Sequence, residues 1–204
     1  LFGVIPITEG TVEYNEKVIL IRSPRDAIEK KIGYVTEDRK EEGLIMTQTI
    51  KKNIVLPSVD RYQKHGIINN KLEKKSVADV FSKLEIHAPG IDYPVRFLSG
   101  GNQQKVVLAK WLVTNSDILI FDEPTRGIDV GAKQEIYKLM RDLADQGKAI
   151  IMISSELPEI LGMSDRILVM SEGEITGELN PQTTTEEMII SLATHTKLEK
   201  KMPP

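Results

Sequence analysis

The stretch Ile118-Leu119-Ile120-Phe121-Asp122-Glu123-Pro124 places two acids directly after four apolar residues. A continuous apolar run of this length is typical of a strand covered on both faces of a parallel sheet. Carboxylates that follow such a strand emerge at its carboxyl end, where open α/β sheets bind ligands. We expect Pro124 to end the strand and to hold Glu123 extended. The alternative is a surface turn with two solvated acids, and the apolar run and the proline favour the ligand site.

The two acids can have different roles, because consecutive side chains on a strand point to opposite sides. A hydrated Mg²⁺ prefers one or two carboxylates together with phosphate oxygens. A second carboxylate can orient or deprotonate a water molecule. The pair therefore suits magnesium-assisted hydrolysis, although the residues alone do not say which acid has which role.

Outward from this stretch, a second apolar run lies at Ala149–Ile153, and Ala132–Ala144 carries apolar residues at helical spacing before a Gly147 stop. This order predicts a βαβ unit with a right-handed connection. Downstream, the patterns predict a hairpin and then a helix. These elements are expected at 167–170 with 174–178, and at 185–194.

On the other side, Leu98-Ser99-Gly100-Gly101-Asn102-Gln103-Gln104 precedes a strongly helical segment, Gln103–Val113. Ser99 is a good N-cap, and the two glycines leave backbone amides uncovered. A helix N-terminus with bare amides favours anions. A plain loop before a helix is the alternative, and for a lone Ser-Gly-Gly it would be preferred. The full seven-residue string so close to the Asp-Glu strand favours the anion site.

The sequence pattern changes near residue 50. The segment before it combines an alternating hairpin, a short helix opened by Ser23-Pro24, a strand and a polar stretch. These are expected at 11–14 with 17–21, at 23–31, at 32–35 and at 36–43. Between Ile50 and Phe97, apolar residues recur at helical spacing with Lys and Glu on the other face. This indicates a small helical lobe inserted into a mixed sheet domain.

Composition excludes several classes of function. A formal net charge of −3 over 204 residues provides no basic excess for phosphate backbones, so we expect no nucleic-acid partner. The absence of cysteine excludes a disulfide framework and a thiolate metal site. The longest apolar runs are far shorter than the ~20 residues that a membrane-spanning helix needs. The start, Leu1-Phe2-Gly3-Val4, lacks an initiator Met, and we expect a chain cut from something longer.

Five ordered motifs together resemble a known family, the ABC ATPases. Leu98–Gln104 resembles the signature, Ile118–Glu123 the Walker B strand, and Pro124–Asp129 the D-loop. With Thr36–Arg39 and Ser154–Glu159, the set is similar to one branch in particular. That branch is the C-terminal half of the tandem ATPase subunits of bacterial simple-sugar importers, of the ribose, galactose, arabinose and xylose type. The resemblance extends to about Ala193.

The resemblance implies an α/β fold, with a P-loop NTPase-like mixed or parallel sheet core, an antiparallel β part and an inserted helical subdomain. It implies four regions. They are a β-rich and core part at 1–49, a helical subdomain at 50–97, a RecA-like core at 98–195 and a disordered tail at 196–204.

In the family, two ATPase halves sandwich two nucleotides, each between one half's phosphate loop and the other's signature. Carried over, four signature residues would contact the γ-phosphate of ATP held by the partner half: Ser99, Gly100, Gly101 and Gln103. Asp122 would position Mg²⁺ and Glu123 would be the general base. Asp129 would lie in the D-loop at the interface between the halves.

The resemblance also implies partners and a location. The expected partners are an N-terminal ATPase half of the same subunit or a second ATPase subunit, and a transmembrane sugar permease. A periplasmic or extracellular sugar-binding protein would act indirectly. The chain would then lie peripherally at the cytoplasmic face of the cell membrane and energise carbohydrate import with ATP.

Three departures from the family pattern concern the phosphate site of this half. The sequence contains no Gly-rich phosphate loop with Lys-Ser/Thr, which the family would place just before Leu1. The usual Gln that senses Mg²⁺ and water is Glu37, and the usual switch His is Ser155. A hydroxyl cannot supply the cationic contact of an imidazole. We therefore expect this half to act mainly through its signature, and the isolated chain to be inactive or nearly so.

Several alternatives stay open. The chain could be a catalytically silent half that serves as a scaffold or regulatory module, or a non-transport ABC ATPase. The charged stretch Arg39-Lys40-Glu41-Glu42 lies where the family has its permease-coupling loop. An interface and a plain surface loop are equally compatible with these residues.

Overall fold

A computed structural model describes residues 1–64 and 66–194, and the chain falls into two compact units, 1–153 and 154–204. Each unit has its own core. The tail predicted at 196–204 lies outside the described residues, and the predicted boundaries near residues 50 and 98 stay a prediction.

The centre of the first unit is a parallel three-stranded sheet with the order β3-β6-β7. Its strands are β3 (Ile32–Val35), β6 (Ile118–Asp122) and β7 (Ala149–Ile153). In the register, Val35 pairs with Phe121 and Asp122 pairs with Ile153. Leu119 and Phe121 are fully buried. The carboxyl ends of the three strands therefore meet at one edge, as the apolar run before Asp122 predicts.

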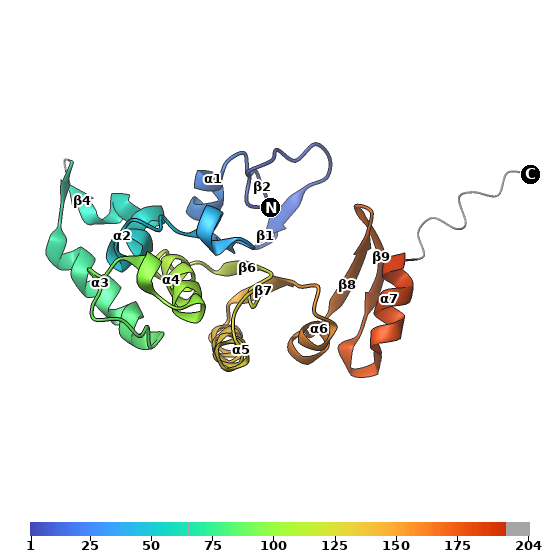
Figure 1. The fold of residues 1–204 in the computed structure, drawn as a ribbon. Coiled ribbons are helices and arrows are strands. Elements are labelled where there is room, and N and C mark those ends of the chain that lie inside the picture. The colour runs from blue at the N-terminus through green and yellow to red at the C-terminus, as the bar shows by residue number, and fades with distance from the viewer. Residues whose placement is uncertain (65, 195–204) are drawn as a thin grey trace, which may run out of the picture. The chain divides into compact units, whose positions relative to one another are not determined.

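Helices α4 (Gly100–Val113) and α5 (Val130–Asp145) lie on one side of β6 and β7 (Figure 1). On the other side lie the antiparallel hairpin of β1 (Val12–Tyr14) and β2 (Lys17–Ile19), and α1 (Pro24–Glu29). The helix α5 contains the predicted helical pattern and is followed by Gly147, whose φ of +82° suits the left-handed turn. The predicted βαβ unit is confirmed.

The expectation that both apolar strands are covered on both faces is wrong for β7. Ile151 is 40% exposed and Ile153 is 48% exposed. The strand β7 pairs only with β6 in the described residues, and α5 packs against it. Alternate side chains of a strand point to opposite faces, so a helix on one face leaves the other set in solvent.

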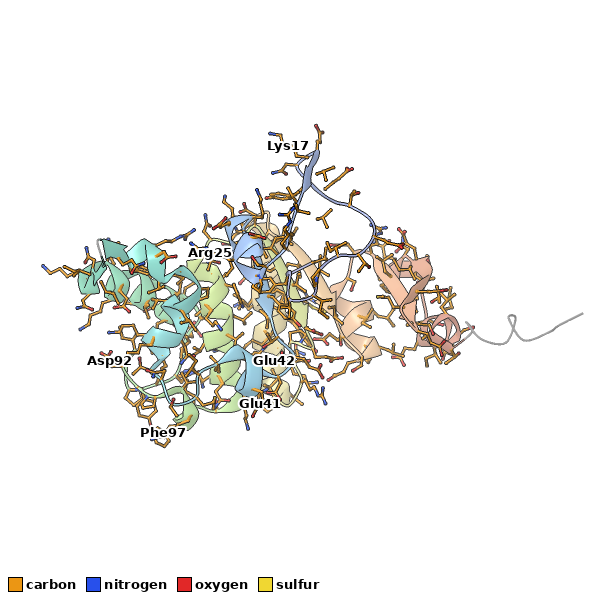
Figure 2. The ribbon with its side chains drawn as sticks, turned by 90° about the horizontal axis from the view of Figure 1, so that it is seen from above. Lys17, Arg25, Glu41, Glu42, Asp92 and Phe97 are labelled. Carbon is orange, nitrogen blue, oxygen red and sulfur yellow. The ribbon has the colours of Figure 1, made fainter. Side chains whose placement is uncertain are left out.

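Between β3 and α4 the chain forms mainly short helices that pack around α4. They are η1 (Arg39–Gly43), α2 (Ile50–Val55), η2 (Leu56–Tyr62), α3 (Asn70–Lys83) and η3 (Val95–Phe97), with a small hairpin of β4 (Gln63–Lys64) and β5 (Ile67–Ile68). Figure 2 labels Glu41 and Glu42 on η1, and Asp92 and Phe97 on the segment before α4. Buried Asn53 fixes the chain before α2, because its side chain bonds Ile45 N, Ile45 O and Thr49 O.

As far as residue 194, the second unit contains an antiparallel hairpin and two main helices. Its elements are α6 (Leu157–Met163), β8 (Ile167–Ser171), β9 (Glu174–Leu179), η4 (Pro181–Thr183) and α7 (Glu186–Thr194). Ile167, Val169 and Ile189 form its buried core. The hairpin and the last helix follow the predicted order, with boundaries that differ by one residue.

Candidate functional site

Ser99 is the N-cap of α4, as the sequence predicts. Its hydroxyl oxygen accepts hydrogen bonds from the backbone N of Asn102 at 3.4 Å and from Asn102 Nδ2 at 3.0 Å. The first turn of a helix carries amides without helical partners and the positive end of the helix dipole. The electrostatics at the N-terminus of α4 therefore favour the binding of an anion.

Helices α4 and α5 approach each other so closely at residue 101 that only a glycine fits there without a shift of the chain. A Cβ atom at Gly101 would lie 2.8 Å from the Cβ atom of Ala132. Ala132 belongs to the first turn of α5, whose N-cap is Asp129, and Asp129 Oδ1 accepts from the Ala132 backbone N at 2.9 Å. The missing side chain thus lets the starts of the two helices lie side by side, which brings Ser99 and Asp129 together.

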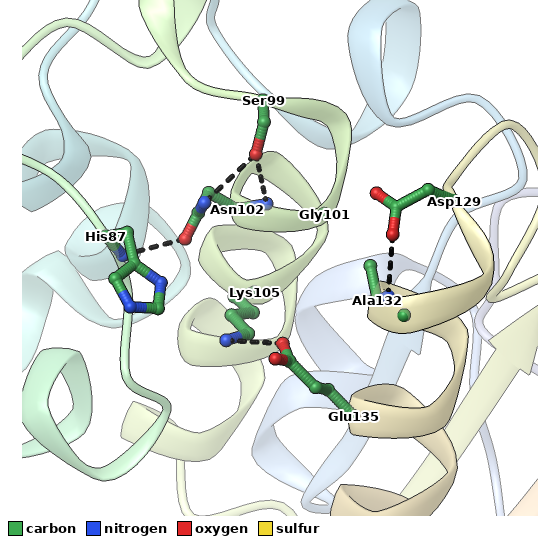
Figure 3. Close-up of a pocket in the computed structure, with 9 residues that line it drawn as sticks. His87, Ser99, Gly101, Asn102, Lys105, Asp129, Ala132 and Glu135 are labelled. Atoms are coloured by element: carbon green, nitrogen blue, oxygen red, sulfur yellow. Dashed lines mark hydrogen bonds and ion pairs between the residues drawn. The ribbon is translucent and has the colours of Figure 1, made fainter.

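The N-terminal turns of α4 and α5 line a pocket of about 240 Å³, called the Ser99 pocket below (Figure 3). It is lined by His87, Ser99, Gly101, Asn102, Lys105, Asp129, Gly131, Ala132 and Glu135. The sequence-predicted Ser99, Gly101 and Asp129 are therefore in one place.

Three polar contacts fix the walls of this pocket. The His87 backbone N donates to Asn102 Oδ1 at 2.7 Å. Buried Lys105 forms an ion pair with Glu135 at 2.8 Å and donates to the Glu85 carbonyl at 3.1 Å. The sequence analysis predicted no site role for the four lining residues in these contacts, which are His87, Asn102, Lys105 and Glu135. Asn102 and Lys105 lie on the helix that Ser99 begins, so its periodicity was a usable signal, whereas His87 and Glu135 come from distant segments.

Gln103 does not line the pocket. Its side chain is only 4% exposed, and Nε2 donates to the Leu98 carbonyl at 3.2 Å and to the Val95 carbonyl at 3.4 Å. Its amide group therefore holds the backbone that leads to Ser99. The predicted contact between Gln103 and a nucleotide stays a prediction.

Asp122 lies at the carboxyl end of β6 beside Tyr34 of β3. The Tyr34 hydroxyl donates to Asp122 Oδ2 at 2.7 Å. Burial is the main cause that raises the pKa of Tyr34 well above its ordinary value, and this hydrogen bond is the second. The hydroxyl therefore stays protonated and donates. The contact orients the carboxylate of Asp122 at the sheet edge.

Glu123 is not extended, contrary to the expectation from Pro124. Its φ is +45°, in the left-handed region that a non-glycine residue rarely adopts. Its backbone N donates to the Ile153 carbonyl at 2.9 Å, and its carbonyl accepts from the Arg126 backbone N at 3.1 Å. These two hydrogen bonds turn the chain sharply after β6, and they outweigh the local preference of a residue before proline. Positive φ at a non-glycine residue stores strain, which is common at functional sites.

Glu37 does not line the Ser99 pocket. Glu37 follows β3 and forms an ion pair with the Arg126 side chain. Ser155 belongs to the second unit, where its neighbour Ser154 donates to buried Glu159 and accepts from the Glu156 backbone N. The structure describes Ser155 within its own unit only.

None of the helices in the described residues is long and apolar enough to span a bilayer. No group of three or more His, Cys, Asp or Glu side chains in that part of the chain has the arrangement of a metal site.

The fold is that of an ATP-binding cassette. A nucleotide-free ATP-binding cassette from an ABC transporter superposes with a TM-score of 0.76, covers 98% of this chain and 79% of that structure, and is 20% identical. An ATP-binding cassette in its ADP conformation superposes with a TM-score of 0.73 at 21% identity, over 97% of this chain and 78% of the other. The predicted α/β fold class is confirmed.

A profile of the ABC transporter family matches residues 1–126, and the chain belongs to this family. The ribose import ATP-binding protein RbsA of Lacticaseibacillus paracasei is 53% identical over 95% of this chain. A putative ribose/galactose/methyl galactoside import ATP-binding protein of Albidiferax ferrireducens is 52% identical over the same share. The chain spans about 39% of the length of these relatives.

Proposed function

We propose that this chain is part of an ATPase subunit that energises carbohydrate import, and that it supplies its signature segment to a nucleotide held by a partner half. The support is the family, the sugar-import names of the relatives, and one observation of geometry. Ser99, Gly101 and Asp129 line a single pocket at the N-terminus of α4. Within this pocket the N-terminus of α4 is the part that favours phosphate, while the lining also includes the carboxylates of Asp129 and Glu135, the latter paired with Lys105.

The phosphate-binding part of the proposal rests on the start of α4. The backbone amides of Gly100 and Gly101 stand in the first turn, where they have no helical acceptor. The Ser99 hydroxyl can add a donor, since a hydroxyl both donates and accepts. Such donors at a helix N-terminus stabilise phosphate oxygens. We infer that Ser99, Gly100 and Gly101 bind the terminal phosphate of ATP.

The hydrolytic part rests on Asp122 and Glu123. Asp122 fits a Mg²⁺–phosphate site, because it stands at the carboxyl end of β6 with one carboxylate oxygen oriented by Tyr34. When bound, Mg²⁺ would neutralise charge on the phosphates. Glu123 follows Asp122 directly and begins the sharp turn that ends the strand, with a φ of +45°. We infer that Glu123 orients and deprotonates the attacking water.

The location and partners follow from the same proposal. A permease in the membrane, a second ATPase half and an external sugar-binding protein would complete the importer. The chain would then lie at the cytoplasmic face of the membrane. The candidate permease contacts are η1, which contains the charged stretch Arg39–Glu42, and the segment before α4, where Phe97 is 58% exposed beside Arg96 and Tyr93.

Replacement of Glu123 by Gln in the intact transporter tests the hydrolytic role. A general base contributes about 10²–10⁴-fold, so turnover at this half's site should fall by about that factor. Glu13→Gln, at an exposed acid of β1, is the matched control. Single-turnover hydrolysis of bound ATP measures the effect, and a rate equal to that of Glu13→Gln would contradict the assignment.

The proposed action on the partner's nucleotide has a separate test, Ser99→Arg. A large side chain at the start of α4 fills the pocket and should block hydrolysis at the site on the partner half. The assay uses a transporter in which only the site on the partner half can hydrolyse ATP. Unchanged turnover there would rule out the role in trans.

A catalytically silent half is the second candidate function. The observation that favours it is the ion pair between Glu37 and Arg126, which engages the acid that replaces the family's usual glutamine. Ser155 also offers a hydroxyl where the family has an imidazole. The two candidates differ in the Glu123→Gln experiment, since a silent half would not respond.

A further inference from the structure

Arg39 connects three segments that the sequence separates. It is the first residue of η1, and its guanidinium donates from Nη1 to the Arg126 carbonyl at 2.9 Å and from Nη2 to the Gly127 carbonyl at 3.2 Å. It also lies against the start of α4, because a Cβ atom at Gly100 would come within 2.9 Å of Nη2. The Arg39 side chain therefore connects the segment after β3, on which it lies, with the turn after Glu123 and with the start of α4.

The backbone that carries Arg39 is anchored at both ends of η1. At the start, Asp38 Oδ1 accepts from the backbone N of Lys40 at 2.9 Å and of Glu41 at 3.1 Å. At the end, the Gly43 carbonyl accepts from buried Lys110 of α4 at 2.6 Å. The guanidinium is thus presented from a fixed short helix rather than from a free loop.

The two carbonyls that Arg39 holds belong to the turn that sets the catalytic candidates. The Arg126 backbone N donates to the Glu123 carbonyl, and Asp129 caps α5 only two residues after Gly127. Gly127 has a φ of +68°, so its carbonyl is presented by a conformation that favours glycine. The planar fork of an arginine can bond two acceptors at once, which a lysine ammonium does not match.

We propose that Arg39 is a positioning residue, which holds the Arg126–Gly127 turn against the N-terminus of α4. In this way it sets Glu123 and Asp129 relative to Ser99. The Glu37–Arg126 ion pair is a second connection between the same segments. The role in turnover rests on the proposed function, whereas the structural role does not.

The test compares Arg39→Ala and Arg39→Lys with Lys40→Ala, whose position on η1 is adjacent and exposed. Hydrogen exchange of the intact protein reports on the backbone amides of residues 126–129. Loss of two charge-assisted hydrogen bonds should speed exchange there by about tenfold in Arg39→Ala. Arg39→Lys should give an intermediate rate, and Lys40→Ala the wild-type rate.

Turnover gives the second measurement. Because Arg39 is not placed on the nucleotide, Arg39→Ala should lower kcat by about tenfold with KM for ATP changed by less than about twofold. Arg39→Lys should recover part of kcat. Wild-type exchange at 126–129 in Arg39→Ala would overturn the proposal. If the wild-type transporter hydrolyses no ATP, the proposed function fails, while the exchange experiment still decides the role of Arg39.

Discussion

Among single residues, Lys110 carries a charge in an unusual place. Its side chain is buried on α4, and Nζ donates to the Gly43 carbonyl. Burial lowers its pKa from 10.5 to about 8. The folded chain therefore pays for burying an ammonium group at neutral pH, and this cost disappears once the group loses its proton.

The sign of the resulting pH dependence follows from proton binding. The pKa of Lys110 is lower in the folded chain than in the unfolded chain, so the unfolded chain binds more protons between pH 8 and 10.5. The free energy of unfolding should rise with pH in that window, by roughly 3 kcal/mol for this group. Relative to Lys110→Met, wild-type stability should increase from pH 7.5 to 10.5.

Urea unfolding at several pH values measures this difference. Lys52→Met, at an exposed lysine, is the matched control. A constant difference between wild type and Lys110→Met across the window would contradict the burial argument.

Glu123 shows what local sequence cannot determine at one residue. The rule for a residue before proline predicts extended backbone, yet the φ angle is +45°. The deciding contact is the hydrogen bond from its N to the Ile153 carbonyl, thirty residues away in sequence. A rule based on neighbours in the chain does not include such a contact.

At the scale of elements, local patterns predicted the parallel strands and the helix between them well. The strand Ala149–Ile153 has the predicted bounds, and β6 is one residue longer than its apolar run. These elements were predictable because apolar periodicity and capping residues act within a few residues. The exposed face of β7 was not, because it depends on which elements cover the sheet.

The packing of α4 on α5 gives a prediction at the same scale. Gly101→Ala would place a Cβ atom 2.8 Å from the Cβ atom of Ala132, and both belong to helix starts that cannot easily give way. We expect a loss of about 1–3 kcal/mol in the free energy of unfolding, as for other overpacked contacts. Gly90→Ala, where a Cβ atom would have no neighbour within 4 Å, is the control.

Urea midpoints of the two variants and the wild type provide the measurement. Because Gly101 also lines the Ser99 pocket, its variant should lose activity together with stability. Equal midpoints for Gly101→Ala and Gly90→Ala would mean that the two helices separate at little cost.

For the whole molecule, the proposed chemistry is divided between two halves. The Ser99 pocket serves a nucleotide held elsewhere, so the chain on its own should turn over ATP at a negligible rate. A steady-state ATPase assay of the purified chain checks this, with circular dichroism to establish that the mixed α/β fold is present. Steady hydrolysis that Glu123→Gln abolishes would contradict the division of roles.

The sequence by itself determined the class of this protein. The signature at 98–104, the acids after the apolar strand and the capping serine are local patterns, and each depends on backbone chemistry within a few residues. The tertiary structure decided which of these residues lie together. It placed Ser99, Gly101 and Asp129 in one pocket with His87 and Glu135, buried Gln103, and made Arg39 a link between three segments. The physical reason is that such contacts join residues far apart in the chain, and only the packing of α4 against α5 and η1 brings them within bonding distance.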